Sequence, residues 1–308
     1  MTPFRFVTAD VFTDRTFGGN QLAVFPDAKG IDPRLMPAIA REFNFSETTF
    51  VLPPADPANT ARVRIFTPGG ELPFAGHPTV GTAHVLAVTG AIRLTGDSTK
   101  IVFEEGVGPV PVTIRSEAGR PVFAQLTAAK RPEVGPPAPA RDRLAEMLSL
   151  EPGALRSGAY IPESVSCGVP FLFVPLVNRA AVAAARLKLD LWEQVLSGYV
   201  TSKVFVFAED AERPGSDVRA RMFAPGIGVP EDPATGSAAV ALAGYLAARD
   251  TRRDGTLRWI VEQGFEMGRP SILEAEADKK DGEVTATRVG GSTVIVTQGE
   301  MTLPGRSD

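Results

Sequence analysis

Apolar runs bounded by glycine and proline recur along the chain and predict strands. In the first half these runs cover 4–12, 21–25, 48–52, 61–66 and 100–104, and in the second half they lie near 169–177, 203–208 and 218–223. Apolar residues at helical spacing predict helices at 32–43 and 78–88, and again near 141–148 and 237–249. Because strands and helices are mixed in both halves, the pattern predicts an α+β protein.

A short motif occurs twice in the chain. Residues 64–69 read RIFTPG and residues 221–226 read RMFAPG, 157 positions later. Each copy is followed by a turn-rich stretch and then by a helix start made of small residues, at 75–83 and at 234–240. A weaker echo relates 19–25 to 168–174. Three echoes in the same order predict two domains related by duplication.

The length of the chain also favours two domains, because 308 residues exceed one ordinary hydrophobic core. We expect an N-terminal domain over 1–118 and a C-terminal domain over 119–308. The last predicted strand, at about 294–304, either stays in the C-terminal domain or returns to the N-terminal domain. The proline-rich stretch 131–141 is expected to be a semi-rigid surface connection, and the charged stretch 274–283 a solvated hairpin or loop.

Composition excludes several functional classes. A formal net charge of −4 provides no basic field for nucleic acid. The N-terminus lacks the pattern of a signal peptide and no run approaches a membrane span, so we expect a cytoplasmic protein with no membrane partner. With one cysteine and two histidines, an internal disulfide and a Cys-rich or His-rich metal site are excluded. No phosphate-binding loop or dinucleotide fingerprint follows a predicted strand.

The two repeat copies share the form strand, Pro-Gly turn, irregular loop and helix start. Such a start exposes backbone N–H groups at the positive end of a helix dipole, where a carboxylate or oxyanion is stabilised. Gly76 and Gly236 could equally serve only to permit tight turns. The occurrence of the pattern in both halves favours a functional site.

Three polar residues near these segments are candidates for acid/base chemistry. His77 follows Gly76 at a helix start, where the dipole favours a neutral imidazole, although a lone histidine is more often structural. Asp232 is either a helix N-cap or a site residue. Glu47 lies at the entry to an apolar strand, and it is either solvated or buried with a raised pKa, in which case it would serve as a general base.

Four motifs together resemble the PhzF-like (phenazine biosynthesis-like) branch of the diaminopimelate epimerase-like fold. They are DVF at 10–12 with FGGN at 17–20, FSET at 45–48, AGHPT at 75–79 and DPATGSA at 232–238. The resemblance covers residues 10 to about 245, and it departs from the usual pattern at Gln21, where proline commonly follows the Gly-Asn pair. It implies two α+β domains, each a barrel-like sheet around a central helix, with the active site between them and a homodimer as the usual assembly.

The resemblance also implies roles for individual residues. The phenazine enzyme of this branch moves a proton between carbons with a glutamate as shuttle, and the matching glutamate is Glu47. His77, Asp232 and Ser237 match the other polar site positions. The expected substrate-binding positions are Asn20, Gly76, Thr235 and Gly236. Related epimerases use two cysteines, for which this chain has Ala75 and Ala234, so a two-thiol racemisation is excluded. Cys167 is assigned to packing.

Two functions are therefore in competition. The first is an isomerase that needs no cofactor and moves a proton between carbons of a small carboxylate. The alternative is a catalytically silent binding or regulatory protein that uses the same cleft for a small carboxylate. The set Glu47, His77, Asp232 and Ser237 favours the first, because a binder has no need of an acid/base pair.

Overall fold

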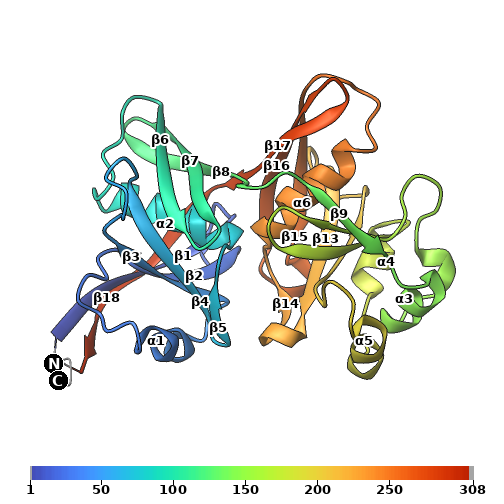
Figure 1. Ribbon diagram of the computed structural model, residues 1–308, viewed down its shortest axis with the longest axis horizontal. Helices are drawn as coiled ribbons and strands as arrows, with labels where there is room; N and C mark the ends of the chain where they lie inside the picture. The colour runs from blue at the N-terminus through green and yellow to red at the C-terminus, as the bar shows by residue number, and fades with distance from the viewer. Residues whose placement is uncertain (1, 305–308) are drawn as a thin grey trace. The chain divides into compact units, whose positions relative to one another are not determined.

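The computed structural model describes residues 2–304, which form two compact units. Unit 1 comprises the described residues up to Ala129 together with those from Gly290 onward, and unit 2 runs from Lys130 to Val289. Figure 1 shows the elements of both units. None of the helices over residues 2–304 is long and apolar enough to cross a membrane.

Unit 1 consists mainly of strands. Its elements are β1 (Thr2–Val11), β2 (Asn20–Phe25), α1 (Met36–Phe43), β3 (Glu47–Leu52), β4 (Ala61–Thr67), β5 (Gly70–Leu72), α2 (Gly76–Val88), β6 (Ser98–Glu105), β7 (Gly108–Glu117), β8 (Arg120–Thr127) and β18 (Thr293–Leu303). The strands pair in the order β18, β1, β2, β3, β4, β6, β7 and β8. The pairs β2/β3 and β4/β6 are parallel and the others are antiparallel.

Unit 2 repeats this plan with additional helices. Its elements are β9 (Glu133–Pro137), α3 (Arg141–Met147), η1 (Pro152–Ala154), β10 (Glu163–Ser166), β11 (Pro170–Pro175), α4 (Arg179–Ala184), α5 (Leu189–Leu196), β12 (Val204–Ala208), β13 (Val218–Ala224), η2 (Pro225–Ile227), β14 (Val229–Asp232), α6 (Gly236–Ala247), β15 (Gly255–Gln263), η3 (Phe265–Met267), β16 (Ser271–Lys280) and most of β17 (Glu283–Gly291). The strands pair in the order β9, β10, β11, β12, β13, β15 and β16, and the pairs β11/β12 and β13/β15 are parallel.

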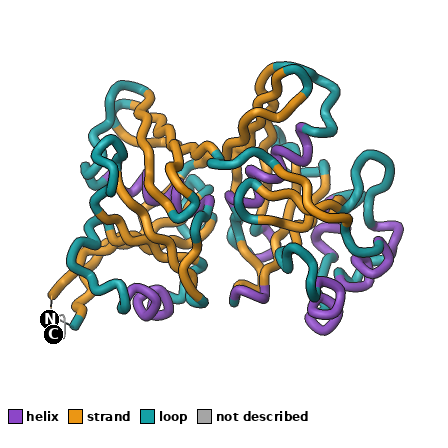
Figure 2. The backbone as a smooth tube through the Cα atoms, in the orientation of Figure 1, coloured by secondary structure: helices purple, strands orange, loops and turns teal. Residues whose placement is uncertain are grey.

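The same sequence of antiparallel and parallel pairings from β1 to β7 and from β10 to β16 confirms two similar α+β domains. In each unit the strands enclose one long helix, α2 or α6, which is apolar around nearly its whole circumference and almost fully buried. A helix that is apolar on all sides belongs in a core. In unit 1, α2 packs against β1, β2 and β8, and in unit 2, α6 packs against β10, β11 and β16. Figure 2 shows α3, α4 and α5 of unit 2 gathered at one side of its strands.

Both copies of the repeated motif form the same cluster of side chains, which explains why the same residues recur. Arg64 of β4 makes a bidentate ion pair with Glu71 at 2.7 Å and lies over the Phe66 ring. In unit 2, Arg221 makes a bidentate pair with Glu231 at 2.7 and 2.8 Å and lies over the Phe223 ring. The arginine therefore ties the repeat strand to the segment that leads to the following helix.

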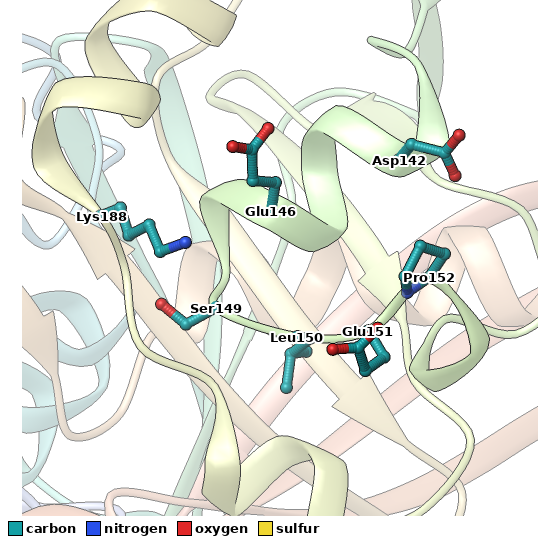
Figure 3. A pocket seen from close by; sticks show the side chains of 7 residues that line it. All are labelled: Asp142, Glu146, Ser149, Leu150, Glu151, Pro152 and Lys188. Atoms are coloured by element: carbon teal, nitrogen blue, oxygen red, sulfur yellow. The ribbon is translucent and has the colours of Figure 1, made fainter.

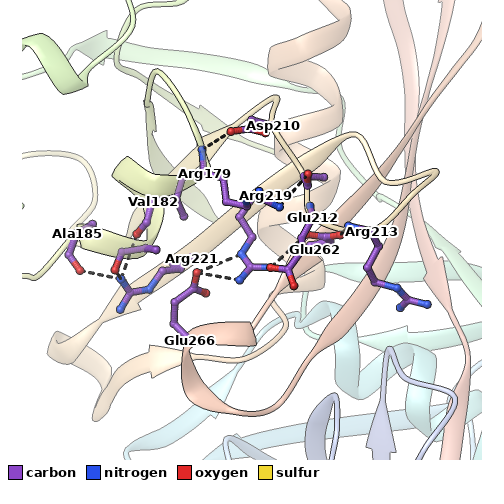
Figure 4. Close-up of polar contacts among 12 residues, drawn as sticks. Arg179, Val182, Ala185, Asp210, Glu212, Arg213, Arg219, Arg221, Glu262 and Glu266 are labelled. Carbon is purple, nitrogen blue, oxygen red and sulfur yellow. Dashed lines mark hydrogen bonds and ion pairs between the residues drawn. The ribbon is translucent and has the colours of Figure 1, made fainter.

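Buried arginines continue this network on β13. Arg219 contacts Glu262 at 3.1 Å and Glu266 at 3.0 Å, and Arg221 also donates to the Ala185 carbonyl (Figure 4). Fully buried Glu262 accepts from two backbone N–H groups as well, those of Glu212 and Arg213. Because each buried charge has several partners, the cluster fixes the chain on both sides of β13.

Two predicted segments differ from the structure. The helix predicted from residue 32 begins at Met36, because the Asp32 carboxylate accepts the Arg34 N–H and folds residues 32–35 into a turn. The proline-rich connection contains the exposed strand β9, which pairs with β10. Prolines are tolerated there because β9 is an edge strand.

Candidate active site

Asn20, Glu47 and His77 come together in unit 1 although they are far apart in the sequence. Asn20 begins β2 and Glu47 begins β3, and because these strands are parallel neighbours, with Leu22 opposite Glu47, both residues lie at the same edge. His77 is the second residue of α2, which packs against both strands. The fold therefore places an amide, a carboxylate and an imidazole at one location.

The loop before Asn20 is held in a conformation that few residues adopt. Phe12, Phe17 and Gly19 all have positive φ, and a Cβ atom on Gly19 would lie 2.3 Å from the Val11 carbonyl oxygen. The Asp10 carboxylate accepts the Phe17 N–H at 2.7 Å. This loop returns the chain tightly onto β1 and fixes the buried start of β2, so glycine is required at position 19.

The His77 ring is buried and neutral. Burial lowers the pKa of His77 to about 3, against a smaller opposing effect of the Gln21 backbone. The Asn20 amide nitrogen lies 3.1 Å from Nδ1, so with the amide as donor the ring carries its proton on Nε2. That Nε2 atom lies 3.3 Å from Glu47 Oε2. The contact between His77 and Glu47 therefore places a carboxyl group beside a neutral imidazole.

Glu47 has a side chain that is 12 % exposed, against 4 % for His77. The carboxyl group is therefore mostly removed from water but keeps an opening to its surroundings. A carboxylate with this partial burial, with one oxygen 3.3 Å from an imidazole nitrogen, can exchange a proton with a bound molecule.

The α2 helix begins at this location without a side-chain cap. Ala75 is the N-cap residue, it has an extended backbone and no side-chain oxygen, and there is no acidic residue in the first turn of α2. The first N–H groups of an α-helix have no partner within the helix. The start of α2 at Gly76 and His77 thus presents a positive end beside Glu47.

In unit 2 the corresponding segment contains Asp232 and Thr235. The Thr235 hydroxyl donates to Asp232 Oδ2 at 2.5 Å and accepts from Gln263 Nε2 at 2.9 Å. Gln263 also donates to the Asp232 carbonyl at 2.8 Å and accepts the Thr235 N–H at 3.0 Å. The buried side chains of Thr235, at the start of α6, and Gln263, at the end of β15, therefore orient the Asp232 carboxylate.

The α6 helix also starts without a side-chain cap or an acidic first turn. Thr235 is its N-cap and Gly236 its first residue, and the half-buried Ser237 follows. Because α2 and α6 begin at Gly76 and Gly236, the counterpart of Ala75 is Thr235 and not Ala234. Neither position is a cysteine, so the exclusion of a two-thiol pair is unaffected.

The sequence alone did not identify Glu105 and Gln263 as site residues. Both are buried and polar, and they lie at the ends of β6 and β15. A signal was present, because each is followed by glycine and the pairs EG at 105–106 and QG at 263–264 are separated by nearly the same offset as the repeated motif. Cys167 is buried in unit 2, 3.5 Å from the Thr287 hydroxyl, and burial raises its pKa to about 11. It is a packing residue.

Unit 2 also has a surface pocket of about 360 Å³ beside α3 (Figure 3). Its lining includes Asp142, Glu146, Glu151 and Lys188, and no predicted site residue lines it. The pocket therefore does not belong to the candidate site.

The family model described as phenazine biosynthesis-like protein matches residues 9–299, nearly the whole chain. The chain belongs to this PhzC–PhzF family.

Several relatives of the chain are named isomerases. The chain is 39 % identical over 301 residues to an uncharacterised isomerase of Mesorhizobium japonicum, with 96 % of this chain and 98 % of the relative covered. It is 35 % identical over 300 residues to trans-2,3-dihydro-3-hydroxyanthranilate isomerase of Pseudomonas aeruginosa, with 97 % and 99 % covered. This PhzF-family protein is an isomerase.

Solved structures agree with this assignment. A PhzF-family protein of Bacillus anthracis has a TM-score of 0.87 at 25 % identity, over 98 % of this chain and all of that one. A predicted epimerase of Pseudomonas aeruginosa has a TM-score of 0.79 at 31 % identity, with the same coverage. A probable proline racemase of Agrobacterium radiobacter, at 14 % identity, shares the fold.

Proposed function

We propose that this PhzF-family isomerase moves a proton between two carbon atoms of a small carboxylate, with Glu47 as the group that carries the proton. The observation that supports this role is the 3.3 Å contact between Glu47 Oε2 and the Nε2 atom of a neutral histidine. A cationic histidine would stabilise the carboxylate and weaken it as a base, whereas a neutral one adds no charge beside it.

The reaction is redox-neutral and requires no co-reactant. The Glu47 carboxylate takes a proton from carbon, and the electron pair of the broken C–H bond enters the neighbouring unsaturated system. The carboxylic acid then returns the proton to a second carbon, which restores the carboxylate. Acid/base catalysis of this kind contributes about 10²- to 10⁴-fold, so stabilisation of the enolate-like state is needed as well.

The uncapped starts of α2 and α6 are suited to that stabilisation. Their N–H groups at Gly76 and Gly236 bind carboxylate or enolate oxygens, which the helix dipoles favour. Asn20 holds the His77 ring. Asp232, Thr235 and Ser237 bind the donor groups of the substrate, such as amine or hydroxyl hydrogens. The substrate class is therefore a small unsaturated acid with a polar substituent.

The first compound to test is trans-2,3-dihydro-3-hydroxyanthranilate, followed by other small unsaturated acids. Thermal stabilisation identifies the compounds that bind, and incubation in D₂O with mass spectrometry then detects deuterium at carbon. We expect at least one binding acid to incorporate deuterium in an enzyme-dependent manner. Binding without incorporation by every acid would instead favour the binding or regulatory protein.

We further propose a cytoplasmic homodimer, as the family resemblance implies. The chain has a mass of 32.6 kDa. Light scattering after size exclusion, at the concentration used for the exchange assay, should give twice this mass. A value equal to the chain mass would contradict the dimer.

A further inference from the structure

Glu105 and Gln263 occupy the same position in the two units. In unit 1 the parallel pairing of β4 with β6 places Arg62 opposite Glu104. In unit 2 the pairing of β13 with β15 places Arg219 opposite Glu262. Arg62 and Arg219 are separated by the offset of the repeated motif, so the residue after each glutamate is also equivalent. Those residues are Glu105 and Gln263.

The glycines that follow them are equivalent as well. A Cβ atom on Gly106 would lie 2.8 Å from the Pro73 Cα atom, and one on Gly264 would lie 2.5 Å from the Pro233 carbonyl oxygen. Pro73 and Pro233 each stand three residues before the first glycine of α2 or α6. The end of β6 therefore lies tightly against the loop that leads into α2, and the end of β15 lies in the same way against the loop that leads into α6.

The polar side chains complete the contact. Gln263 is fully buried and binds that loop through both its donor and its acceptor, at Thr235 and at the Asp232 carbonyl. Glu105, which is 8 % exposed, has its Oε1 atom 2.6 Å from the Thr79 hydroxyl in the first turns of α2. The Thr79 hydroxyl also lies 2.7 Å from the carbonyl oxygen of Ala75, the N-cap residue.

These distances constrain the proton on Glu105. A threonine hydroxyl has one hydrogen and a carbonyl oxygen can only accept, so the hydrogen of Thr79 cannot serve both Ala75 and an ionised Glu105. A second short contact at 2.6 Å then needs a hydrogen from Glu105. Glu105 Oε2 is buried and has no hydrogen-bond partner among residues 2–304. That atom is tolerable as the carbonyl oxygen of an acid but costly as part of a carboxylate.

Neighbouring charges do not oppose a protonated state. Burial is the main cause of the raised pKa of Glu105, at about 8. The titratable groups on the adjoining elements are His77 and His84 on α2, Arg62 and Arg64 on β4, and Lys100 and Glu104 on β6 itself. None of them is a cause of this shift. Arg115 and Glu117 lie at the other end of β7, since Arg115 pairs with Ser98.

We propose that Glu105 is a positioning residue that works as a carboxylic acid, and that Glu105 and Gln263 form a duplicated clamp that sets the start of each central helix. As an acid, Glu105 has the donor and acceptor of a glutamine side chain, so it is the chemical counterpart of Gln263. In unit 1 the clamp holds the turn that carries Gly76 and His77. In unit 2 it holds Asp232 and Thr235. The catalytic consequence of the clamp rests on the proposed function, while the protonation of Glu105 does not.

The direct test is the ionisation of Glu105, measured by ¹³C NMR on protein labelled at the glutamate side-chain carboxyl carbon. The Glu105→Gln variant assigns the Glu105 signal by its loss. Glu104 is the matched control, because it is the adjacent residue and its carboxylate accepts hydrogen bonds from the Asn59 side-chain amide and from the N–H groups of Ala55 and Asp56, which lower its pKa. At pH 6.5 we expect Glu105 protonated and Glu104 ionised. An ionised Glu105 at this pH overturns the proposal whether or not the enzyme acts on any tested acid.

The positioning role is tested by activity in a second step. Glu105→Gln keeps a neutral donor and acceptor, so its kcat/KM should stay within about threefold of the unmodified enzyme at pH 7. Its rate should also persist above pH 8, where the unmodified enzyme loses activity. Glu105→Leu removes the donor and should lower kcat/KM by roughly tenfold or more. Equal losses of kcat/KM in the glutamine and leucine variants would contradict the clamp. So would a Glu105→Gln enzyme that loses activity above pH 8 in the same way as the unmodified enzyme.

Discussion

The Nε2 atom of His77 lies 3.3 Å from Glu47 Oε2, and the histidine that makes this contact is neutral. The contact brings together the first residue of β3 and the second residue of α2, which are 30 positions apart in the sequence. It is set by parallel strands on one side and by an almost fully buried helix on the other. The geometry shows how the fold places a neutral imidazole beside a largely buried carboxyl group.

The ionisation of the histidines is the first prediction. Burial lowers the pKa of His77 to about 3 and that of His84 to about 4, from an ordinary value of 6.5. Both rings should therefore be neutral at pH 5.5, which ¹⁵N NMR can show cleanly because the chain has only two histidines. Two imidazolium signals at pH 5.5 would contradict the burial of this location.

These lowered pKa values also set the acid stability. A group with a depressed folded pKa stabilises the protein above its unfolded pKa, and this contribution is lost as the pH falls toward the folded value. Between pH 6.5 and about 4, each histidine should reduce the free energy of unfolding by up to about 1.4 kcal/mol per pH unit. His84→Gln should remove its share of this slope in urea titrations.

A second prediction concerns the hydroxyl that links Asp232 with Gln263. Thr235→Val keeps the shape of the side chain but removes one donor and one acceptor. We expect a loss of about 1–3 kcal/mol in the free energy of unfolding and a rise in KM of roughly tenfold, because Asp232 loses its orientation. Thr285→Val is the control, since its hydroxyl makes one longer bond of 3.2 Å to the Asp278 carbonyl. Equal effects of the two changes would contradict the role of Thr235.

A third prediction distinguishes two glycines in neighbouring turns. Gly264 and Gly268 have similar positive φ values, 75° and 70°. A Cβ atom at Gly264 would meet the backbone at 2.4 Å, whereas one at Gly268 would meet nothing within 4 Å. Gly268→Ala should cost about 1 kcal/mol from backbone strain alone, and Gly264→Ala at least about 3 kcal/mol because the loop at Pro233 must move. Chemical denaturation measures both, and similar losses would refute the close approach.

A fourth prediction follows from the raised pKa of Glu105. Its folded pKa of about 8 exceeds the ordinary value of 4.5, so its contribution to stability is complete below pH 4.5 and is lost as the pH rises toward 8. In this window the free energy of unfolding of the unmodified protein should fall, relative to that of Glu105→Gln, by up to about 1.4 kcal/mol per pH unit. Parallel stability curves from pH 5 to pH 8 would contradict a buried acid at this position.

The sequence predicted much of the local structure of both repeats. The apolar runs that became β1 to β4 and the small-residue starts of α2 and α6 are encoded by neighbouring residues. The repeated motif located the Arg64 and Arg221 ion pairs without showing their partners. By contrast, the strand β16 was not predicted. Its buried and half-buried positions alternate and many of its residues are charged, so the sequence of this strand shows no clear apolar run.

The polar contacts of the candidate site could not be predicted in the same way. Gln263 is 28 residues from Thr235, and Glu105 is 26 residues from Thr79. These contacts depend on the register of β4 with β6 and of β13 with β15, which no local pattern specifies. The sequence therefore identified the helix starts and the candidate residues, and the structure identified what holds them.

The central claim is that Glu47 carries the proton, and the most direct measurement is deuterium incorporation into a turned-over substrate by Glu47→Gln in D₂O. We predict a rate about 10²- to 10⁴-fold below that of the unmodified enzyme, with thermal stabilisation by the substrate retained. Glu42→Gln, which alters an exposed glutamate on α1, should incorporate deuterium at the normal rate. A Glu47→Gln enzyme that incorporates deuterium as fast as the Glu42→Gln control would contradict the account.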